Sequence, residues 1–404
     1  MKVDDTIAGK VDDASFTIDS THATLTVTNY KPDIAKTVTK RDGTANTHEA
    51  DYGVGDAVPY TLTIKVPENI TSLKTFTVTD TTVKTQLVQN KDSVKISGKN
   101  NAGGDVTLAE SAYTITVAPD ANNSVMTVAF TPSALTDVAG GEITIAYTAT
   151  VQDTAVVAGN GNVNTAKIVY SRKTNLTEET GGNKPYEITD KGVVYTFGLN
   201  IHKTAKGGTK DGAGLKDVAF DLYKKVADYE IDTDGKVATT IRGKTYSDSD
   251  LCADAVKLGL TTDSTEKWIK IETLTTGENG NVSAKGLPSG IYKLVETKTV
   301  NGYNLLSKPV DAKLNLTYSA AWTTTTTYDE NGNQTKSTIT TPTYKRDNKT
   351  VDNPSAVIEI VNRAGFTLPV TGGFGTLLFS GIGVLLVLAG VGVLFSLKKK
   401  SNRA

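Results

Sequence analysis

The 404-residue sequence has little of what metal and redox sites require. It holds one cysteine, Cys252, and three histidines, His22, His48 and His202. One cysteine cannot form a disulfide within the chain, and so few Cys and His residues cannot assemble a Cys/His metal cluster. The histidines are scattered and no nucleophile–base pair is visible. We therefore predict that the chain is not an enzyme and that it needs no cofactor.

An excess of charge of either sign is also missing. The chain has 43 Lys and Arg residues against 44 Asp and Glu residues, a net charge of −1. Binding of nucleic acid needs a basic excess on one face of the protein. This balance excludes nucleic acid as the main partner.

Helix-forming patterns are scarce, and short alternating strands take their place. Runs such as 60–66 and 143–147 alternate apolar and polar residues and are separated by turns that contain Gly, Asn and Pro. This pattern is typical of half-buried strands in β-sandwiches. We predict an all-β chain with two tandem Ig-like β-sandwich domains. The predicted boundaries are 1–29 (remnant of a preceding domain, or a linker), 30–172 (first sandwich), 173–194 (linker), 195–364 (second sandwich) and 365–404 (a C-terminal segment).

Two segments of the second block have patterns of their own. Ser249 to Leu260 is predicted to form one short helix. Trp322 to Tyr344 is rich in Thr around the turn signal Asn331-Gly332, which indicates a long exposed hairpin, with a flexible adhesive loop as the alternative.

Long apolar runs are absent except at the C-terminus. Phe374 to Leu397 spans 24 residues without a charged side chain, and the basic cluster Lys398 to Arg403 follows. This length is enough for a transmembrane helix, and the basic cluster marks its cytoplasmic end. The preceding residues should then lie outside the cell. Because residues 1–16 hold four Asp residues and no apolar run of signal-peptide length, we expect a missing N-terminal part with an export signal.

The alternation of the second block places three polar residues on apolar faces. Residues two apart in a strand point to the same side. Lys203 follows Leu199 and Ile201, Glu296 follows Tyr292 and Leu294, and Asn362 follows Ile358 and Ile360. A buried lone charge is too costly to remain unpaired, so we expect the three polar side chains to meet.

The first block repeats this arrangement. Lys36 lies between Ile34 and Val38, Asp80 follows Phe76 and Val78, and Asn164 precedes Ala166 and Ile168 on its face. Asp51 competes with Asp80 for the carboxyl position, and Asn162 competes with Asn164.

One reaction explains both sets of residues. The Lys amine attacks the Asn side-chain carbonyl and expels ammonia, which leaves an intramolecular isopeptide bond. Burial lowers the pKa of the Lys and raises that of the acid, which then shuttles protons. Each such bond would join the first strand of a domain to its last strand.

The C-terminal segment resembles the cell-wall sorting signal of Gram-positive surface proteins. Its parts are Leu368-Pro369-Val370-Thr371-Gly372, the apolar run and the basic tail. Pro369 keeps the residue before it extended, which suits binding in a groove. The resemblance implies that a sortase cuts between Thr371 and Gly372 and joins Thr371 to a peptidoglycan precursor or to a pilin lysine.

Most of the remaining chain resembles the domains of isopeptide-forming pilins. Lys203 in LNIHKTA, Glu296 before Gly302-Tyr303, and Asn362 in IEIVNRAG resemble a CnaB-type domain. Lys36 in DIAKTV, Asp80 in TVTDT and Asn164 in NVNTAKIVY resemble a CnaA-like domain. The resemblance implies that the two lysines are nucleophiles, that Asp80 and Glu296 are catalytic acids, and that the two asparagines are acceptors.

The implied function is that of a sortase-anchored pilus (fimbrial) subunit involved in adhesion. Its implied partners are sortase, peptidoglycan or other pilins, and host or neighbouring-cell ligands. It would be extracellular, on the cell wall or in a pilus, with the helix in the membrane only before sorting. Backbone pilins usually carry a YPK-type motif, whereas this chain has Tyr30-Lys31-Pro32, so Lys31 is a candidate acceptor lysine. The alternative is a singly anchored adhesin that does not polymerise.

Overall fold

The computed structural model describes residues 31–171, 185–323, 327–328, 333–335, 338–365 and 387. Residues 1–30, the predicted LPVTG motif, and all of the predicted transmembrane helix except Val387 lie outside the described residues. Within the described part, no helix is both long and apolar enough to cross a membrane. Strands dominate residues 31–365, so the prediction of an all-β fold is confirmed. Short 3₁₀-helices interrupt the strands: η1 (Ile70–Ser72), η2 (Glu110–Ala112), η3 (Pro132–Ala134), η4 (Thr136–Val138), η6 (Gly208–Lys210), η7 (Asp228–Glu230), η8 (Asp248–Asp250) and η9 (Glu278–Gly280).

The first unit, which comprises the described residues from 31 to 195, is built on two packed sheets, and two short strands from later in the chain, β22 (Thr327–Tyr328) and β23 (Gln334–Thr335), extend the second of them. Sheet A has the order β1 (Asp33–Val38), β3 (Ala57–Lys65), β9 (Glu142–Val151), β5 (Leu87–Lys99) and β6 (Asp105–Val106). Sheet B has the order β22, β23, β11 (Tyr186–Tyr195), β10 (Asn162–Tyr170), β4 (Phe76–Val83), β8 (Asn123–Phe130) and β7 (Tyr113–Pro119). The short strand β2 (Glu49–Asp51) pairs in parallel with β11.

The core of the first unit follows from the period of two in its strands. Buried and less buried residues alternate along β3, β9 and β10. Their buried Ile, Val, Leu and Tyr side chains form one apolar cluster with those of β4 and β8. A polar residue in phase with this alternation must therefore point into the core.

The second unit, which comprises the described residues from 196 to 365, also has two main sheets. Sheet C has the order β17 (Asn281–Leu287), β12 (Phe197–Lys206) and β27 (Ala356–Arg363). Sheet D has the order β16 (Trp268–Thr275), β13 (Ala219–Lys225), β18 (Tyr292–Lys298) and β19 (Val310–Asp311). Smaller sheets pair β14 (Thr239–Ile241) with β15 (Lys244–Tyr246), β21 (Trp322–Thr323) with β24 (Thr338–Ile339), and β25 (Thr343–Arg346) with both β20 (Leu316–Ser319) and β26 (Lys349–Val351).

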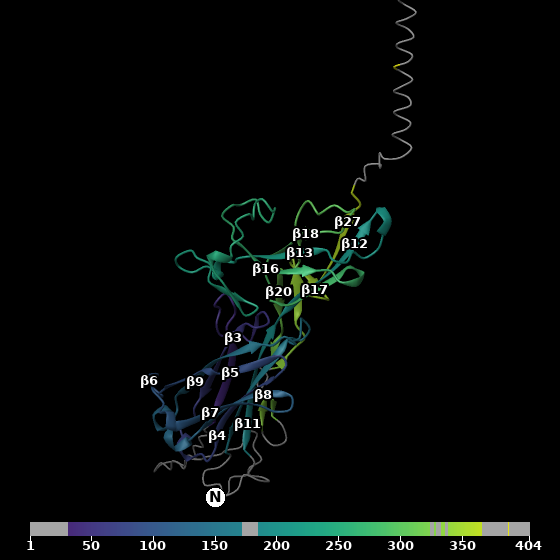
Figure 1. Cartoon of the computed structure of the whole chain (residues 1–404). Coiled ribbons are helices and arrows are strands. Elements are labelled where there is room, and N and C mark those ends of the chain that lie inside the picture. Colours follow the sequence, from purple (N-terminus) through teal and green to yellow (C-terminus); the bar gives the residue numbers. More distant parts are fainter. Residues whose placement is uncertain are drawn as a thin grey trace, which may run out of the picture.

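The two units lie end to end and are joined by almost continuous β-structure (Figure 1). Strand β11 ends at Tyr195 and β12 begins at Phe197, so only Thr196 separates them. The last nine residues of the predicted linker 173–194 are therefore not a free connection, because residues 186–194 lie in β11 and pair with β10. The alternating Tyr186, Ile188 and later apolar residues explain this pairing, since they bury one face of the strand in the core.

Polar contacts also hold the two units together. The Arg41 guanidinium, after β1, pairs with the buried Glu230 carboxylate of the second unit. The Asp51 carboxylate accepts hydrogen bonds from the Tyr318 hydroxyl at 2.8 Å and from the Ser289 backbone N–H at 2.7 Å. Side chains as well as the continuous chain therefore connect the two units.

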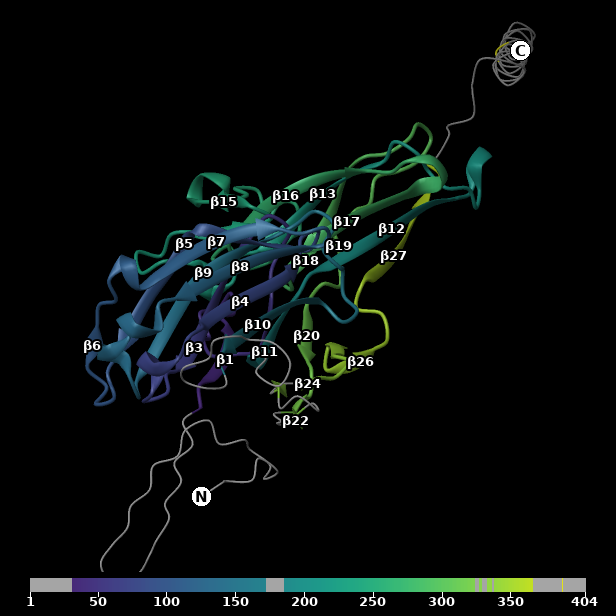
Figure 2. The ribbon, with the colours of Figure 1, turned by 90° about the horizontal axis from the view of Figure 1, so that it is seen from below.

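The described strands of the Thr-rich segment pair as a hairpin, β21 with β24 and β22 with β23, and part of this hairpin is joined to the first unit. Strand β23 pairs in parallel with β11, with Gln334 opposite Ile188, and so extends sheet B of the first unit. Figure 2 shows β20, β22 and β24 beside β10 and β11. The free edge of β11 offers unpaired backbone groups, which explains why this strand docks there.

The helix predicted for Ser249 to Leu260 is not present. This segment contains part of the 3₁₀-helix η8 (Asp248–Asp250) and a series of turns. Gly259 adopts a φ of +75°, which ends the last turn. With Gly near its end, the segment is too short for a helix to form without strong packing.

Candidate functional site

The first site lies between the two sheets of the first unit. Lys36 comes from β1 of sheet A, whereas Asp80 and Asn164 come from the adjacent strands β4 and β10 of sheet B. Asp80 lies opposite Ala166, two residues from Asn164, so both side chains share the inner face. All three residues are 0% exposed. The structure therefore brings together the three residues that the alternation pattern selected.

A tyrosine hydroxyl connects the members of the first site. The Lys36 ammonium pairs with the Asp80 carboxylate and also donates a hydrogen bond to the Tyr147 hydroxyl at 2.6 Å. The Asn164 Nδ2 donates to the same hydroxyl at 3.0 Å. Lys36 Nζ also lies 4.5 Å from the centroid of the Tyr60 ring, and the Gln89 Nε2 donates to Asp80 Oδ1 at 2.9 Å.

Burial makes the Lys36 ammonium lose its proton more readily than an exposed lysine does. Burial lowers the pKa of Lys36 below its usual value, and the nearby Asp80 carboxylate only partly offsets this effect. An uncharged amine has a free lone pair and is a nucleophile. The side-chain carbonyl Oδ1 of Asn164 is buried without a hydrogen-bond partner. A buried carbonyl oxygen without a hydrogen-bond donor lowers the stability of the fold, unless a donor reaches it at some stage.

The second site lies across the sheets of the second unit. Lys203 is on β12 and Asn362 on the neighbouring parallel strand β27, with Lys203 opposite Ile360 and Ala205 opposite Asn362. Glu296 comes from β18 of sheet D. Lys203 is 0% exposed, Asn362 1% and Glu296 6%. The three selected residues of this block are thus buried together as well.

The carboxyl group of the second site contacts the amide rather than the amine. The Asn362 Nδ2 donates to Glu296 Oε1 and to Thr299 Oγ1, both at 2.7 Å. The other Glu296 oxygen accepts from the Leu306 backbone N–H at 2.8 Å. Lys203 Nζ donates to the Ile360 carbonyl at 3.3 Å. Burial lowers the pKa of Lys203 to about 8, against a smaller opposing effect of Glu296.

The amide of Asn362 is left with the same unpaired atom as that of Asn164. Its Oδ1 is buried without a hydrogen-bond partner. Rotating the amide by half a turn would exchange Oδ1 and Nδ2 and place the oxygen at Glu296. The carbonyl oxygen would then lie beside the carboxyl group of Glu296.

Each site brings together a Lys amine, a carboxyl group and an Asn amide. These are the groups that an exchange of one amide for another would use.

The alternatives that the sequence left open occupy other positions. Asp51 bonds to Ser289 and Tyr318 at the junction between the units. The Asn162 side chain is held by the backbone of Val156 and Val194. Neither residue makes a hydrogen bond to Lys36 in the described structure.

Sequence reasoning missed the residues that orient these sites. Tyr147, Gln89 and Thr299 were not selected, although Tyr147 is in phase with the buried face of β9. A Tyr in phase with apolar residues looks like an ordinary core residue, because its ring satisfies the apolar environment. Only the buried hydroxyl requires a partner.

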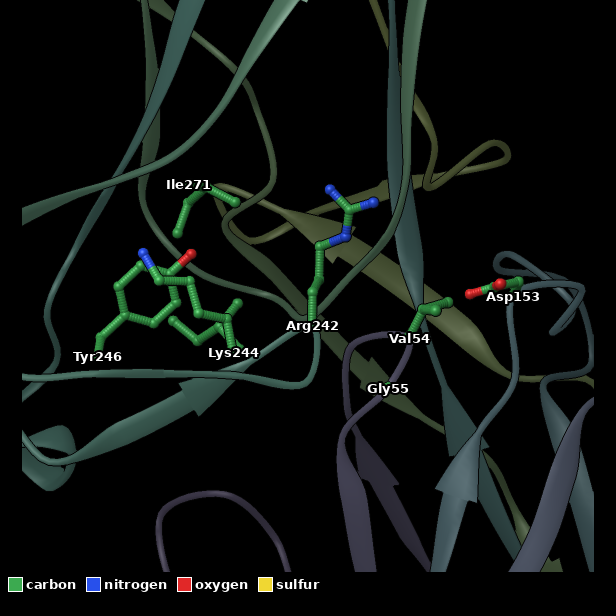
Figure 3. Close-up of a pocket in the computed structure, with 8 residues that line it drawn as sticks. Val54, Gly55, Asp153, Arg242, Lys244, Tyr246 and Ile271 are labelled. Atoms are coloured by element: carbon green, nitrogen blue, oxygen red, sulfur yellow. The ribbon is translucent and has the colours of Figure 1, made fainter.

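Other features of the described residues offer less chemistry. A search of these residues finds no group of three or more His, Cys, Asp or Glu that could hold a metal ion. A cleft of about 280 Å³ opens at the junction of the units, between Val54 and Asp153 on one side and Arg242, Lys244 and Tyr246 on the other (Figure 3). This cleft is open to solvent, and it is not lined by a buried Lys beside a buried carboxyl group. The two Lys, carboxyl and Asn sets are therefore the stronger candidates.

Comparison with solved structures finds pilins from several Gram-positive bacteria. The 35 kDa C-terminal fragment of the major pilin GBS80 of Streptococcus agalactiae is 20% identical over 70% of this chain and 90% of that one, with a TM-score of 0.45. The T6 backbone pilin of Streptococcus pyogenes is 19% identical over 83% and 70%, with a TM-score of 0.49. The full-length major pilin SpaD of Corynebacterium diphtheriae is 19% identical over 83% and 66%, with a TM-score of 0.47. At these identities and TM-scores, the matches do not assign the chain to a family.

Comparison by sequence finds a match over only part of the chain. No curated protein matches the chain. A family model does match residues 198–331, which include Lys203, Glu296 and most of the second unit. About a third of the chain is thus similar to the SpaA prealbumin-like fold domain.

Proposed function

We propose that this chain is a structural protein of a Gram-positive cell surface, a pilus subunit whose two units each close an intramolecular Lys–Asn isopeptide bond. One observation carries the proposal. A buried Lys, a buried carboxyl group and a buried Asn with an unpaired carbonyl oxygen meet twice, in two separate cores. One buried Lys beside an acid is an ordinary ion pair, but ion pairing does not account for the Asn in each set.

The proposed roles are the same in both units. Lys36 and Lys203 act as nucleophiles on the side-chain carbons of Asn164 and Asn362. Asp80 and Glu296 act as acids that move a proton and stabilise the carbonyl oxygen. In each case one C–N bond forms, one C–N bond breaks, and ammonia leaves.

The anchoring part of the proposal rests on the sequence. In the proposal, a sortase cuts Leu368-Pro369-Val370-Thr371-Gly372 between Thr371 and Gly372, after the apolar run has held the chain in the membrane. The mature protein is then extracellular, bound to the cell wall or to another pilin, and supports adhesion. Its partners are the sortase and the amine that receives Thr371.

Lys31 is the proposed amine for polymerisation. It lies two residues before β1, is exposed, and donates a hydrogen bond to Gln334 of β23. Lys31 lies before the first unit, whereas Thr371 follows the second unit. A bond between Lys31 of one subunit and Thr371 of another would therefore join subunits head to tail.

The test is the size of the wall-anchored product in a Gram-positive host that has the cognate sortase. The wild-type chain should give a ladder of covalent multimers in denaturing gels of cell-wall extracts. Lys31→Ala should reduce the ladder to the monomer, whereas Lys65→Ala, which removes another exposed lysine of the first unit, should leave it intact. A single anchored species from the wild type would instead indicate a singly anchored adhesin. A ladder that persists in Lys31→Ala would refute the role of Lys31.

A further inference from the structure

The two sites differ in what the carboxyl group touches. In the second unit the Glu296 carboxylate is hydrogen-bonded to the amide nitrogen of Asn362. In the first unit the Asp80 carboxylate pairs with the Lys36 amine and makes no hydrogen bond to Asn164 in the described structure. The reaction needs a proton to travel from the amine to the departing amide nitrogen. The first site therefore needs another group to complete this path.

We propose that the Tyr147 hydroxyl completes the proton path of the first site, as a catalytic proton relay specific to the first unit. This inference rests on the proposed isopeptide chemistry. Its oxygen lies 2.6 Å from Lys36 Nζ and 3.0 Å from Asn164 Nδ2, the two nitrogens between which the proton must move. The hydroxyl also interacts with the Asp80 carboxylate. It thus contacts all three members of the site.

The proton balance of this step is closed. The Lys36 lone pair forms a bond to the side-chain carbon of Asn164, and Nζ gives one proton to the Asp80 carboxylate. Protonated Asp80 gives a proton to the Tyr147 oxygen while the Tyr147 hydroxyl gives its own to Nδ2. The C–Nδ2 bond then breaks and ammonia leaves, so Asp80 and Tyr147 end in their starting forms.

A concerted exchange suits a tyrosine in this position. Burial and the nearby Asp80 raise the pKa of Tyr147 well above its usual value, so the hydroxyl stays protonated. Giving and receiving a proton in one step requires no tyrosinate. The ring is fixed by stacking on Tyr60, with centroids 5.5 Å apart and an angle of 16° between the planes.

The second unit has no equivalent bridge among its described residues. Thr299 Oγ1 contacts Asn362 Nδ2 at 2.7 Å but makes no hydrogen bond to Lys203. Glu296 already reaches the amide directly. Loss of the Tyr147 hydroxyl should therefore slow bond formation in the first unit alone, which makes the second unit an internal control.

The experiment measures both bonds in the full-length chain as it is made. The 404-residue chain is synthesised in a cell-free reaction with detergent, samples are quenched in acid over time, and the branched peptides are quantified after proteolysis. One branched peptide joins Lys36 to Asn164, and the other joins Lys203 to Asn362. Tyr147→Phe is compared with Tyr113→Phe, which removes a tyrosine hydroxyl from β7, the edge strand of sheet B, where the ring packs against Phe130.

Tyr147→Phe should slow the first bond by about 10²-fold or more, the usual contribution of a general acid–base group, and leave the second bond at the wild-type rate. Tyr113→Phe should form both bonds at the wild-type rate. A first-unit rate in Tyr147→Phe equal to that in Tyr113→Phe overturns the relay. If the wild type forms neither branched peptide, the proposed function itself fails, which is a different result.

A second measurement covers the case in which Tyr147→Phe loses both bonds through misfolding, and it uses the wild-type chain. The same time course is followed in D₂O. Because the relay adds the transfer of the Tyr147 proton in the first unit, the first bond should slow by a larger factor in D₂O than the second bond. Equal factors for the two bonds contradict the relay.

Discussion

Under tension applied at the two ends of residues 31–365, the Asn362→Ala chain should lengthen by roughly 500 Å more than the wild type, the length of about 160 extended residues. Strands β12 and β27 are parallel neighbours, and the chain enters through the start of β12 and leaves through the end of β27. A covalent link from Lys203 to Asn362 carries the force directly between these strands. The residues enclosed by the link are then not extended.

Single-molecule force spectroscopy measures this difference. Asn301→Ala removes an exposed Asn of the same unit and should behave as the wild type. A wild-type second unit that extends to the same length as Asn362→Ala would show that no covalent link is present. The expected result supports a subunit built to hold tension without disulfides.

In the first unit, Asn164→Ala should lower the free energy of unfolding by about 5 kcal/mol. The bond from Lys36 encloses well over a hundred residues, and by analogy with a disulfide it stabilises the fold by limiting the unfolded chain. Asp80→Ala should lower the free energy of unfolding further, by about 3–5 kcal/mol beyond the lost bond, because it also leaves the buried Lys36 without its charged partner. Both values follow from denaturant unfolding monitored by circular dichroism.

The comparison between the two variants separates the bond from the ion pair. Asn164→Ala keeps the contact between Lys36 and Asp80 and removes only the acceptor. Asp92→Ala, which replaces an exposed Asp of the same unit, is the control and should change the free energy of unfolding very little. An Asn164→Ala variant as stable as this control would argue against a bond at this site.

The sequence was sufficient to select the residues of both sites because strands have a period of two. Lys36, Asp80 and Asn164 are in phase with large apolar residues, and a polar residue in that phase has to be buried. The same reasoning selected Lys203, Glu296 and Asn362, and all six are buried in the structure. Whether each set reacts is a question of chemistry that burial alone does not answer.

Other features of the structure could not be predicted from local sequence patterns, because they depend on contacts between distant parts of the chain. The sequence of the Thr-rich segment favours a hairpin but does not specify that β23 will pair with β11, because most residues of the hairpin are equally polar on both faces. The bridging position of Tyr147 depends on how sheet A packs on sheet B, which local alternation does not encode. The turns at 249–260 formed where a weak helix pattern lacked packing to stabilise it.

The most direct test of the central claim is the intact mass of the recombinant protein containing residues 31–365. If both bonds form, the mass should fall short of the sequence mass by two ammonia molecules, and proteolysis should give one branched peptide from Lys36 and Asn164 and another from Lys203 and Asn362. Asn164→Ala and Asn362→Ala should each remove one of these losses. A wild-type mass equal to that of the sequence, with no branched peptide, would contradict the account.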